Sequence, residues 1–104
     1  MLKQTILQSA RRKILFLPHA IRQMSRPDRM NTDQDVRRVV MRGELIEHYP
    51  EDARGDSCLM LGSDNAGRPI HVVCSPKADF LAVITAYLPD PQEWEPGFSI
   101  RRKP

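Results

Sequence analysis

The chain has 104 residues, a formal net charge of +3 and a sequence pI of about 9.2. This length allows one domain, residues 1–104, with a single core, and excludes a second domain. Hydrophobic residues make up 40% of the chain and charged residues 28%, which argues against wholesale disorder. No apolar run reaches the length of a membrane span, so we expect a cytoplasmic protein without a membrane partner.

The N-terminal third predicts two helices. Residues 1–15 have mixed helical character and are interpreted as a partial N-terminal extension. A short helix is expected over 19–26, with Pro18 in its first turn. A second helix is expected over 32–42, with Asn31 or Thr32 as its cap, Gln34 available for a capping box and Gly43 at its C-terminal stop.

After Gly43 the period of apolar residues changes from helical to strand-like. The segments 44–49, 57–61, 69–75 and 80–87 are predicted strands, and the glycine-rich segment 62–67 is a turn. Residues 89–104 form a proline-rich, basic tail with the only tryptophan. The sequence thus predicts an α+β fold in which two N-terminal helices pack on a four-stranded antiparallel sheet.

One histidine, His71, lies in the middle of a predicted strand. A tight connection between the last two strands would place it opposite Val83, so that Thr85 and Tyr87 share its face of the sheet. The apolar Ile70, Val72 and Cys74 would face the helices. We expect the His71 face to be exposed, because burial would lower the pKa of the imidazole and leave an unmatched polar group.

The residue pattern alone does not decide what His71 does. A strand histidine is more often a hydrogen-bonded structural residue than a catalyst. Basic residues occur in clusters along the chain and permit a nucleic-acid partner, but a solvated basic surface explains them equally well. No metal or cofactor is expected, since two cysteines and three scattered histidines give no ligand spacing. Cys58 and Cys74 are expected to lie across from each other as reduced core thiols.

Five segments of the chain resemble a known family. They read HAIRQM (19–24), DVRRVVMRGELIEHYPED (35–52), DSCLMLG (56–62), RPIHVVC (68–74) and ITAYLPDPQEW (84–94). Together they resemble a bacterial domain family of unknown function whose members are often encoded beside zinc-finger antitoxins of the YgiT/MqsA type. That family is similar to RelE/ParE-like toxins, which have two helices on an antiparallel sheet. The resemblance implies the toxin of a type II toxin–antitoxin pair, with a cognate antitoxin as its partner.

Many toxins of this kind cleave messenger RNA without a metal, some of them on the ribosome. The hypothesis is therefore a metal-independent endoribonuclease in which His71 acts as acid or base and His19 is its partner, while Tyr87 orients the phosphate or donates a proton. The residues expected to bind RNA are Arg22, Arg26 or Arg29, and Thr85.

Two alternatives stay open. The first is a non-catalytic module with the same fold that binds protein or RNA, for which Trp94 in the tail could serve as an interface anchor. The second is an inactive relative, because Gln23 stands where the family usually has arginine. Convergence of His19, His71 and Tyr87 would favour catalysis, and their separation would favour binding.

Overall fold

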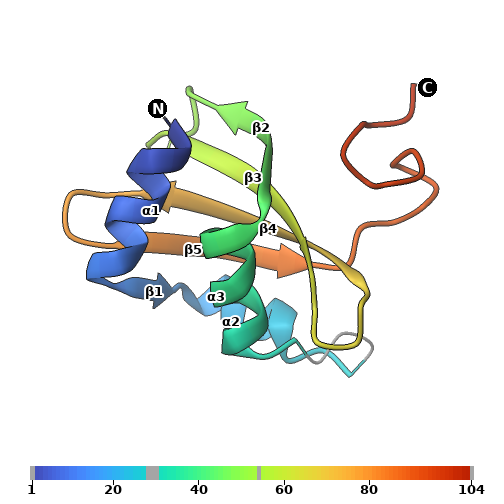
Figure 1. The fold of residues 1–104 in the computed structure, drawn as a ribbon, viewed down its shortest axis with the longest axis horizontal. Coiled ribbons are helices and arrows are strands. Elements are labelled where there is room, and N and C mark those ends of the chain that lie inside the picture. Colours follow the sequence, from blue (N-terminus) through green and yellow to red (C-terminus); the bar gives the residue numbers. More distant parts are fainter. Residues whose placement is uncertain (1, 28–30, 54, 104) are drawn as a thin grey trace.

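The computed structural model describes residues 2–27, 31–53 and 55–103, which form three helices and five strands. In chain order these are α1 (Leu2–Arg12), β1 (Ile14–Phe16), α2 (Pro18–Met24), α3 (Asp33–Arg42), β2 (Glu44–Tyr49), β3 (Ser57–Ser63), β4 (Pro69–Pro76) and β5 (Leu81–Tyr87). The strands form one sheet in the order β1-β5-β4-β3-β2 (Figure 1). β1 is parallel to β5, and the other neighbours are antiparallel.

The predicted fold class is wrong in its elements, although the fold remains α+β. The described residues form a third helix and a fifth strand, and the sheet is mixed rather than antiparallel. Both additions come from the segment interpreted as an extension, in which Ile6 and Ala10 of α1 join the core. β1 has only three residues, too few to show a period, and α1 has no acidic residue in its first turn to signal its start.

The three helices cover one face of the sheet, which we call the inner face (Figure 1). Ile70, Val72 and Cys74 of β4 lie in the core on this face, as predicted. α3 contributes three buried valines, and α2 contributes Ala20 and Met24. None of the helices in the described ranges is long and apolar enough to cross a membrane.

The predicted helix over 32–42 is confirmed. The Thr32 hydroxyl accepts a hydrogen bond from the backbone N–H of Asp35, and the Asp35 carboxylate accepts one from the backbone N–H of Thr32, each at 3.1 Å. This is a capping box, although the side chain that completes it belongs to Asp35 and not to Gln34.

Replacement of Thr32 by alanine is expected to lower the free energy of unfolding by about 1 kcal/mol, because it leaves an amide at the start of α3 without its acceptor. Urea unfolding measures the loss. Gln34→Ala is the matched control, since Gln34 is exposed in the first turn of the same helix and should change stability little. Equal effects of the two substitutions would contradict the role given to the cap.

The sheet register differs from the expected one, and Val83, expected opposite His71, instead pairs with Cys74 in the core on the inner face. His71 pairs with Tyr87 and not with Val83, because the turn between β4 and β5 lies at residues 77–80 and a bulge follows Val73. The shift is four residues. Since side chains alternate with a period of two, Thr85 and Tyr87 still share the face of His71. We call this the outer face.

Candidate active site on the outer face

His71 is fully buried, contrary to the exposed position expected for it. The tail after β5 folds over the outer face and places Trp94 against the imidazole, with ring centroids 4.5 Å apart and planes at 83°. Trp94 is itself only 3% exposed. The outer face therefore has a cover at His71, made of residues that show no secondary-structure period in the sequence.

Two hydrogen bonds determine which ring nitrogen of His71 carries the proton. Nε2 lies 2.8 Å from the carbonyl oxygen of Phe98, and Nδ1 lies 3.3 Å from the hydroxyl of Tyr87. A carbonyl can only accept, so Nε2 must carry hydrogen, and in the neutral ring Nδ1 then accepts from Tyr87. Burial lowers the pKa of His71, while the bond to Phe98 and the charge of Glu47 oppose that shift. The neutral ring is thus the form that this site favours.

A carboxylate and a guanidinium lie next to this histidine pair. Arg101 of the tail donates two hydrogen bonds to Glu47 of β2, from Nε at 2.7 Å and from Nη2 at 3.0 Å. The hydroxyl of Tyr49 donates to the same carboxylate. The bond from Arg101 is the largest of the effects that lower the pKa of Glu47, whereas burial and the bond to Glu47 raise the pKa of Tyr49 to about 12.

Trp94 joins the two groups. The Arg101 guanidinium lies 4.6 Å from the centroid of the Trp94 ring, which also packs against His71. The resulting outer-face cluster consists of Glu47, Tyr49, His71, Tyr87, Trp94, Phe98 and Arg101. It combines a neutral imidazole, two phenols, a carboxylate and a guanidinium, which are groups that transfer protons and bind anions.

The residues predicted from sequence are only partly brought together. Tyr87 contacts His71, with ring centroids 5.3 Å apart. Thr85 faces the same side and is half-buried beside the cluster. His19 is exposed on α2 and is not hydrogen-bonded to His71, because Tyr87 and Phe98 are the partners of both ring nitrogens.

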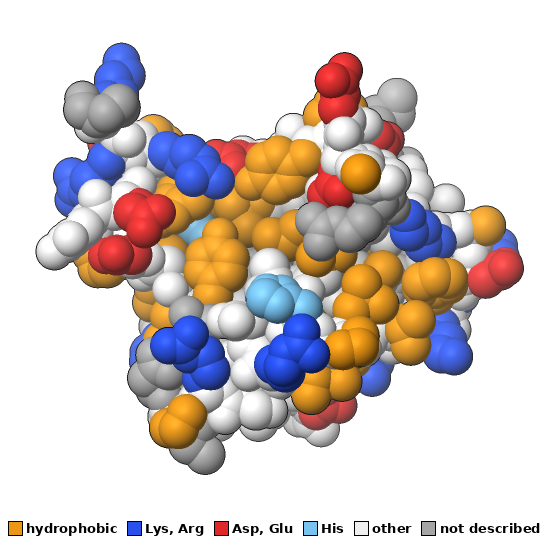
Figure 2. Space-filling view, turned by 180° about the vertical axis from the view of Figure 1, so that it is seen from behind, with side chains coloured by type: hydrophobic (Ala, Val, Ile, Leu, Met, Phe, Trp, Pro, Cys, Tyr) orange, Lys and Arg blue, Asp and Glu red, His pale blue; other side chains and the backbone are white. Residues whose placement is uncertain are grey.

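The predicted basic side of α2 is exposed at Arg22 and Arg26, whereas Arg29 lies outside the described residues. Figure 2 shows the side of the molecule opposite to that of Figure 1. Hydrophobic side chains gather across it, with histidine and several arginine or lysine side chains among and around them. This side therefore offers positive charge next to apolar surface.

Sequence reasoning missed Glu47, Tyr49 and Arg101. A signal existed for the first two, since they alternate on β2 and so share one face of the strand. Arg101 had no such signal, because its position depends on how the tail folds back.

The inner side of the sheet carries a cysteine pair that is not suited to a metal. Cys58 and Cys74 lie directly across from each other, as predicted, with their sulfur atoms 3.7 Å apart and both thiols buried. The hydrogen bond to Cys58 and burial raise the pKa of Cys74. Within the described ranges, no group of three or more histidine, cysteine, aspartate or glutamate residues could hold a metal ion.

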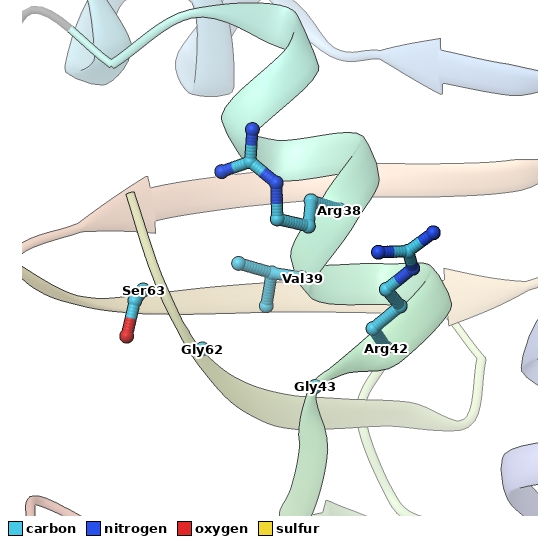
Figure 3. Close-up of a pocket in the computed structure, with 6 residues that line it drawn as sticks. All are labelled: Arg38, Val39, Arg42, Gly43, Gly62 and Ser63. Carbon is cyan, nitrogen blue, oxygen red and sulfur yellow. The ribbon is translucent and has the colours of Figure 1, made fainter. Parts of the chain in front are cut away.

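A hollow of about 140 Å³ at the C-terminal end of α3 is a weaker candidate site. Figure 3 shows Arg38 and Arg42 side by side on α3, with Val39 between them and Gly43 and Gly62 below. Arg38 has a structural partner, the Asp35 carboxylate at 3.4 Å. The positive charge of Arg42 complements the helix dipole in the last turn of α3. The hollow thus offers less chemistry than the outer-face cluster.

Residues 16–88 match the family model for a domain of unknown function (DUF4258). The chain belongs to this family. The matched region of the DUF4258 domain contains strands β2 to β5 with His71 and Tyr87 and only the last residue of β1, and it ends before the tail that carries Trp94, Phe98 and Arg101. No curated protein and no solved structure matches the chain significantly.

Proposed function

We propose that this DUF4258 chain is the toxin of a type II toxin–antitoxin pair and a metal-independent endoribonuclease. The observation that carries the proposal is the hydrogen-bonded His71–Tyr87 pair, which shares its sheet face with a carboxylate and a guanidinium. The likeness of the five sequence segments to a toxin-associated family, similar to RelE/ParE-like toxins, supports the same reading. Its partners would be RNA, including messenger RNA on the ribosome, and a cognate zinc-finger antitoxin.

The proposed reaction uses the ribose 2′-hydroxyl as its nucleophile. A base removes the proton of that hydroxyl, an acid protonates the departing 5′-oxygen, and cations stabilise the charged phosphorane. The neutral imidazole of His71 has one nitrogen free of hydrogen and one that carries it, so together with Tyr87 it can accept and return a proton.

The cations come from the basic side of α2 in this proposal. Arg22 and Arg26 would hold the phosphate, with His19 as a second proton-transfer group. This helix packs on the inner face of β5, whereas Tyr87 and His71 face the outer side, so in this proposal the RNA has to reach both sides of the sheet (Figure 1). Thr85 would contact the RNA from the same strand.

A specific observation favours a second candidate, the non-catalytic module that binds RNA or protein. His71 is fully buried and both of its nitrogens have partners, as in a structural histidine. In that case the outer-face cluster holds the tail in place, and the exposed Arg22 and Arg26 bind the partner. The two candidates differ in whether His71 ever meets RNA.

Cleavage of an end-labelled single-stranded RNA in the presence of a chelator separates them. His71→Gln is expected to slow cleavage by roughly 10²- to 10⁴-fold, the usual contribution of an acid–base group, and Tyr87→Phe should slow it less. His48→Gln is the matched control, since His48 is a partly exposed histidine that pairs with the inner-facing Cys58.

Full activity of His71→Gln would remove the centre of the nuclease proposal. Absence of cleavage by the unaltered protein, on free RNA and on messenger RNA bound to ribosomes, would also overturn it. The hypothesis of a binding module would then be supported if the protein retards the RNA in a gel-shift experiment and if the double variant Arg22→Ala with Arg26→Ala weakens that retardation.

A further inference from the structure

We propose that residues 89–103 act as a latch, which closes the outer-face cluster at rest and is released when RNA phosphates bind its basic end. The biological meaning of this inference rests on the proposed function. The closing and opening of the latch can nevertheless be measured without any cleavage.

The latch is folded on itself. Its backbone hydrogen bonds run from Glu93 and Trp94 to the carbonyl of Asp90, from Glu95 to Ile100, from Phe98 to Glu95 and from Arg102 to Glu93. A bridge between Trp94 and Arg101 also lies inside the segment. Within the part of the chain that the structure describes, none of these bonds joins the latch to a strand of the sheet. It can therefore leave the sheet without breaking the sheet's own ladder.

Three contacts hold the latch on the outer face. The Trp94 ring packs on His71, the Phe98 carbonyl accepts from that imidazole, and Arg101 forms its paired hydrogen bonds with Glu47. The Arg101 side chain is 55% exposed, but its two bonds to the largely buried Glu47 carboxylate have the bidentate geometry in which an ion pair does contribute to stability. Because the Arg101 guanidinium also stacks on the Trp94 ring, loss of the ion pair loosens the packing of Trp94 as well.

A tight turn with left-handed residues positions the latch's contact with His71. Phe98 has a φ of 62°, in the left-handed region that residues with a side chain rarely adopt, and it follows Gly97 with a φ of 93°. This conformation belongs to the residue whose carbonyl contacts His71. The hydrogen bond from the Phe98 N–H to the Glu95 carbonyl closes this turn within the latch, so the turn belongs to the latch itself and aims the Phe98 carbonyl at His71.

RNA phosphate is the competitor that suits the end of the latch. Arg101, Arg102 and Lys103 place three positive charges in succession there, and all three side chains are exposed. A guanidinium pairs with a phosphate through the same two-pronged geometry that it uses with a carboxylate. Exchange of Glu47 for a phosphate would lift Trp94 and Phe98 away and leave the Nε2–H of His71 facing the bound RNA.

Trp94 gives a direct readout, because it is the only tryptophan of the chain. Quenching of its fluorescence by acrylamide should be weak in the unaltered protein, where the ring is buried. Arg101→Glu sets two carboxylates against each other and is expected to raise the quenching constant at least threefold. The charge-swapped pair Glu47→Arg with Arg101→Glu should restore the low value.

Lys103→Glu is the matched control, since it makes the same change of charge at an exposed residue two positions further on and should leave quenching unchanged. A second arm adds a 2′-O-methyl oligoribonucleotide, which has the RNA backbone but lacks the attacking hydroxyl. We expect it to raise quenching of the unaltered protein at low salt and not at high salt.

The outcomes separately test the closing of the latch, its release by RNA and the proposed function. Unchanged quenching in Arg101→Glu, or a swapped pair as open as the single variant, overturns the latch. A latch that opens in Arg101→Glu but not with the oligonucleotide overturns release by RNA. Failure of the proposed function is seen separately, as absence of cleavage by a protein whose latch opens as described.

Discussion

Replacement of Gly43 by alanine is expected to destabilise the protein by about 3 kcal/mol, at the upper end of what overpacking costs. The backbone at Gly43 has φ −74° and ψ 177°, which any residue adopts, so the effect is purely steric. A β-carbon there would lie 2.5 Å from the carbonyl oxygen of Val39 and 2.6 Å from that of Leu61. Both are backbone atoms, so no side-chain rotation relieves the contact, and α3 must move away from β3. Urea unfolding measures the loss.

Gly62 provides the contrast that tests this reason. A β-carbon at Gly62 would meet Cγ2 of Val39 at 2.8 Å, which is a side-chain atom (Figure 3). Val39→Ala removes that atom, so the double variant Val39→Ala with Gly62→Ala should be more stable than the sum of the single effects by about 1 kcal/mol or more. Val39→Ala should restore far less of the stability that is lost in Gly43→Ala. Equal rescue of the two glycines, or a neutral Gly43→Ala, would contradict this account.

The glycine pair also illustrates what the sequence could predict. Gly43 was placed at the end of the helix as a C-terminal stop, and α3 does end there. Glycine is needed there for a different reason than in the usual left-handed cap, however. The close approach of Leu61 on β3 leaves no room for a side chain. Helix signals are local and can be read from neighbouring residues, whereas a close approach between two elements depends on the tertiary fold.

The same distinction explains the errors in the fold. β2 was predicted with its observed bounds, because its alternation and the preceding Gly43 are local. β1 was missed, since three residues become a strand only through their pairing with Leu81–Val83, far along the chain. A short parallel strand at the edge of a sheet leaves almost no pattern of its own.

The candidate site was predicted in part for a related reason. His71 and Tyr87 were assigned to one face by the alternation of side chains, which survived a register error of four residues because that number is even. Burial of His71 could not be predicted in this way. It depends on Trp94, which reaches the imidazole through a tail without helical or strand periodicity.

Acidification from pH 7 to pH 5.5 is expected to lower the free energy of unfolding through His71, by at most about 1.4 kcal/mol for each pH unit. Burial holds the pKa of His71 in the folded protein below its ordinary value of 6.5. The unfolded chain therefore binds the proton first, and the stabilisation is complete above about pH 6.5 and declines as the pH falls below it. Glu47, whose pKa is lowered from 4.5, loses its contribution only in more acidic solution.

Urea unfolding at pH 7.5, 6.5 and 5.5 measures this slope. His71→Gln should remove it, because the amide does not titrate, while His19→Gln should leave it, because His19 is exposed. An unchanged slope in His71→Gln would assign the pH dependence to other groups.

The charged imidazole would also draw water into the space beneath Trp94, so quenching of Trp94 should rise over the same pH range. Joint movement of the two signals would tie the charge of His71 to the position of the tail, because the ring that gains the proton is the one that Trp94 covers.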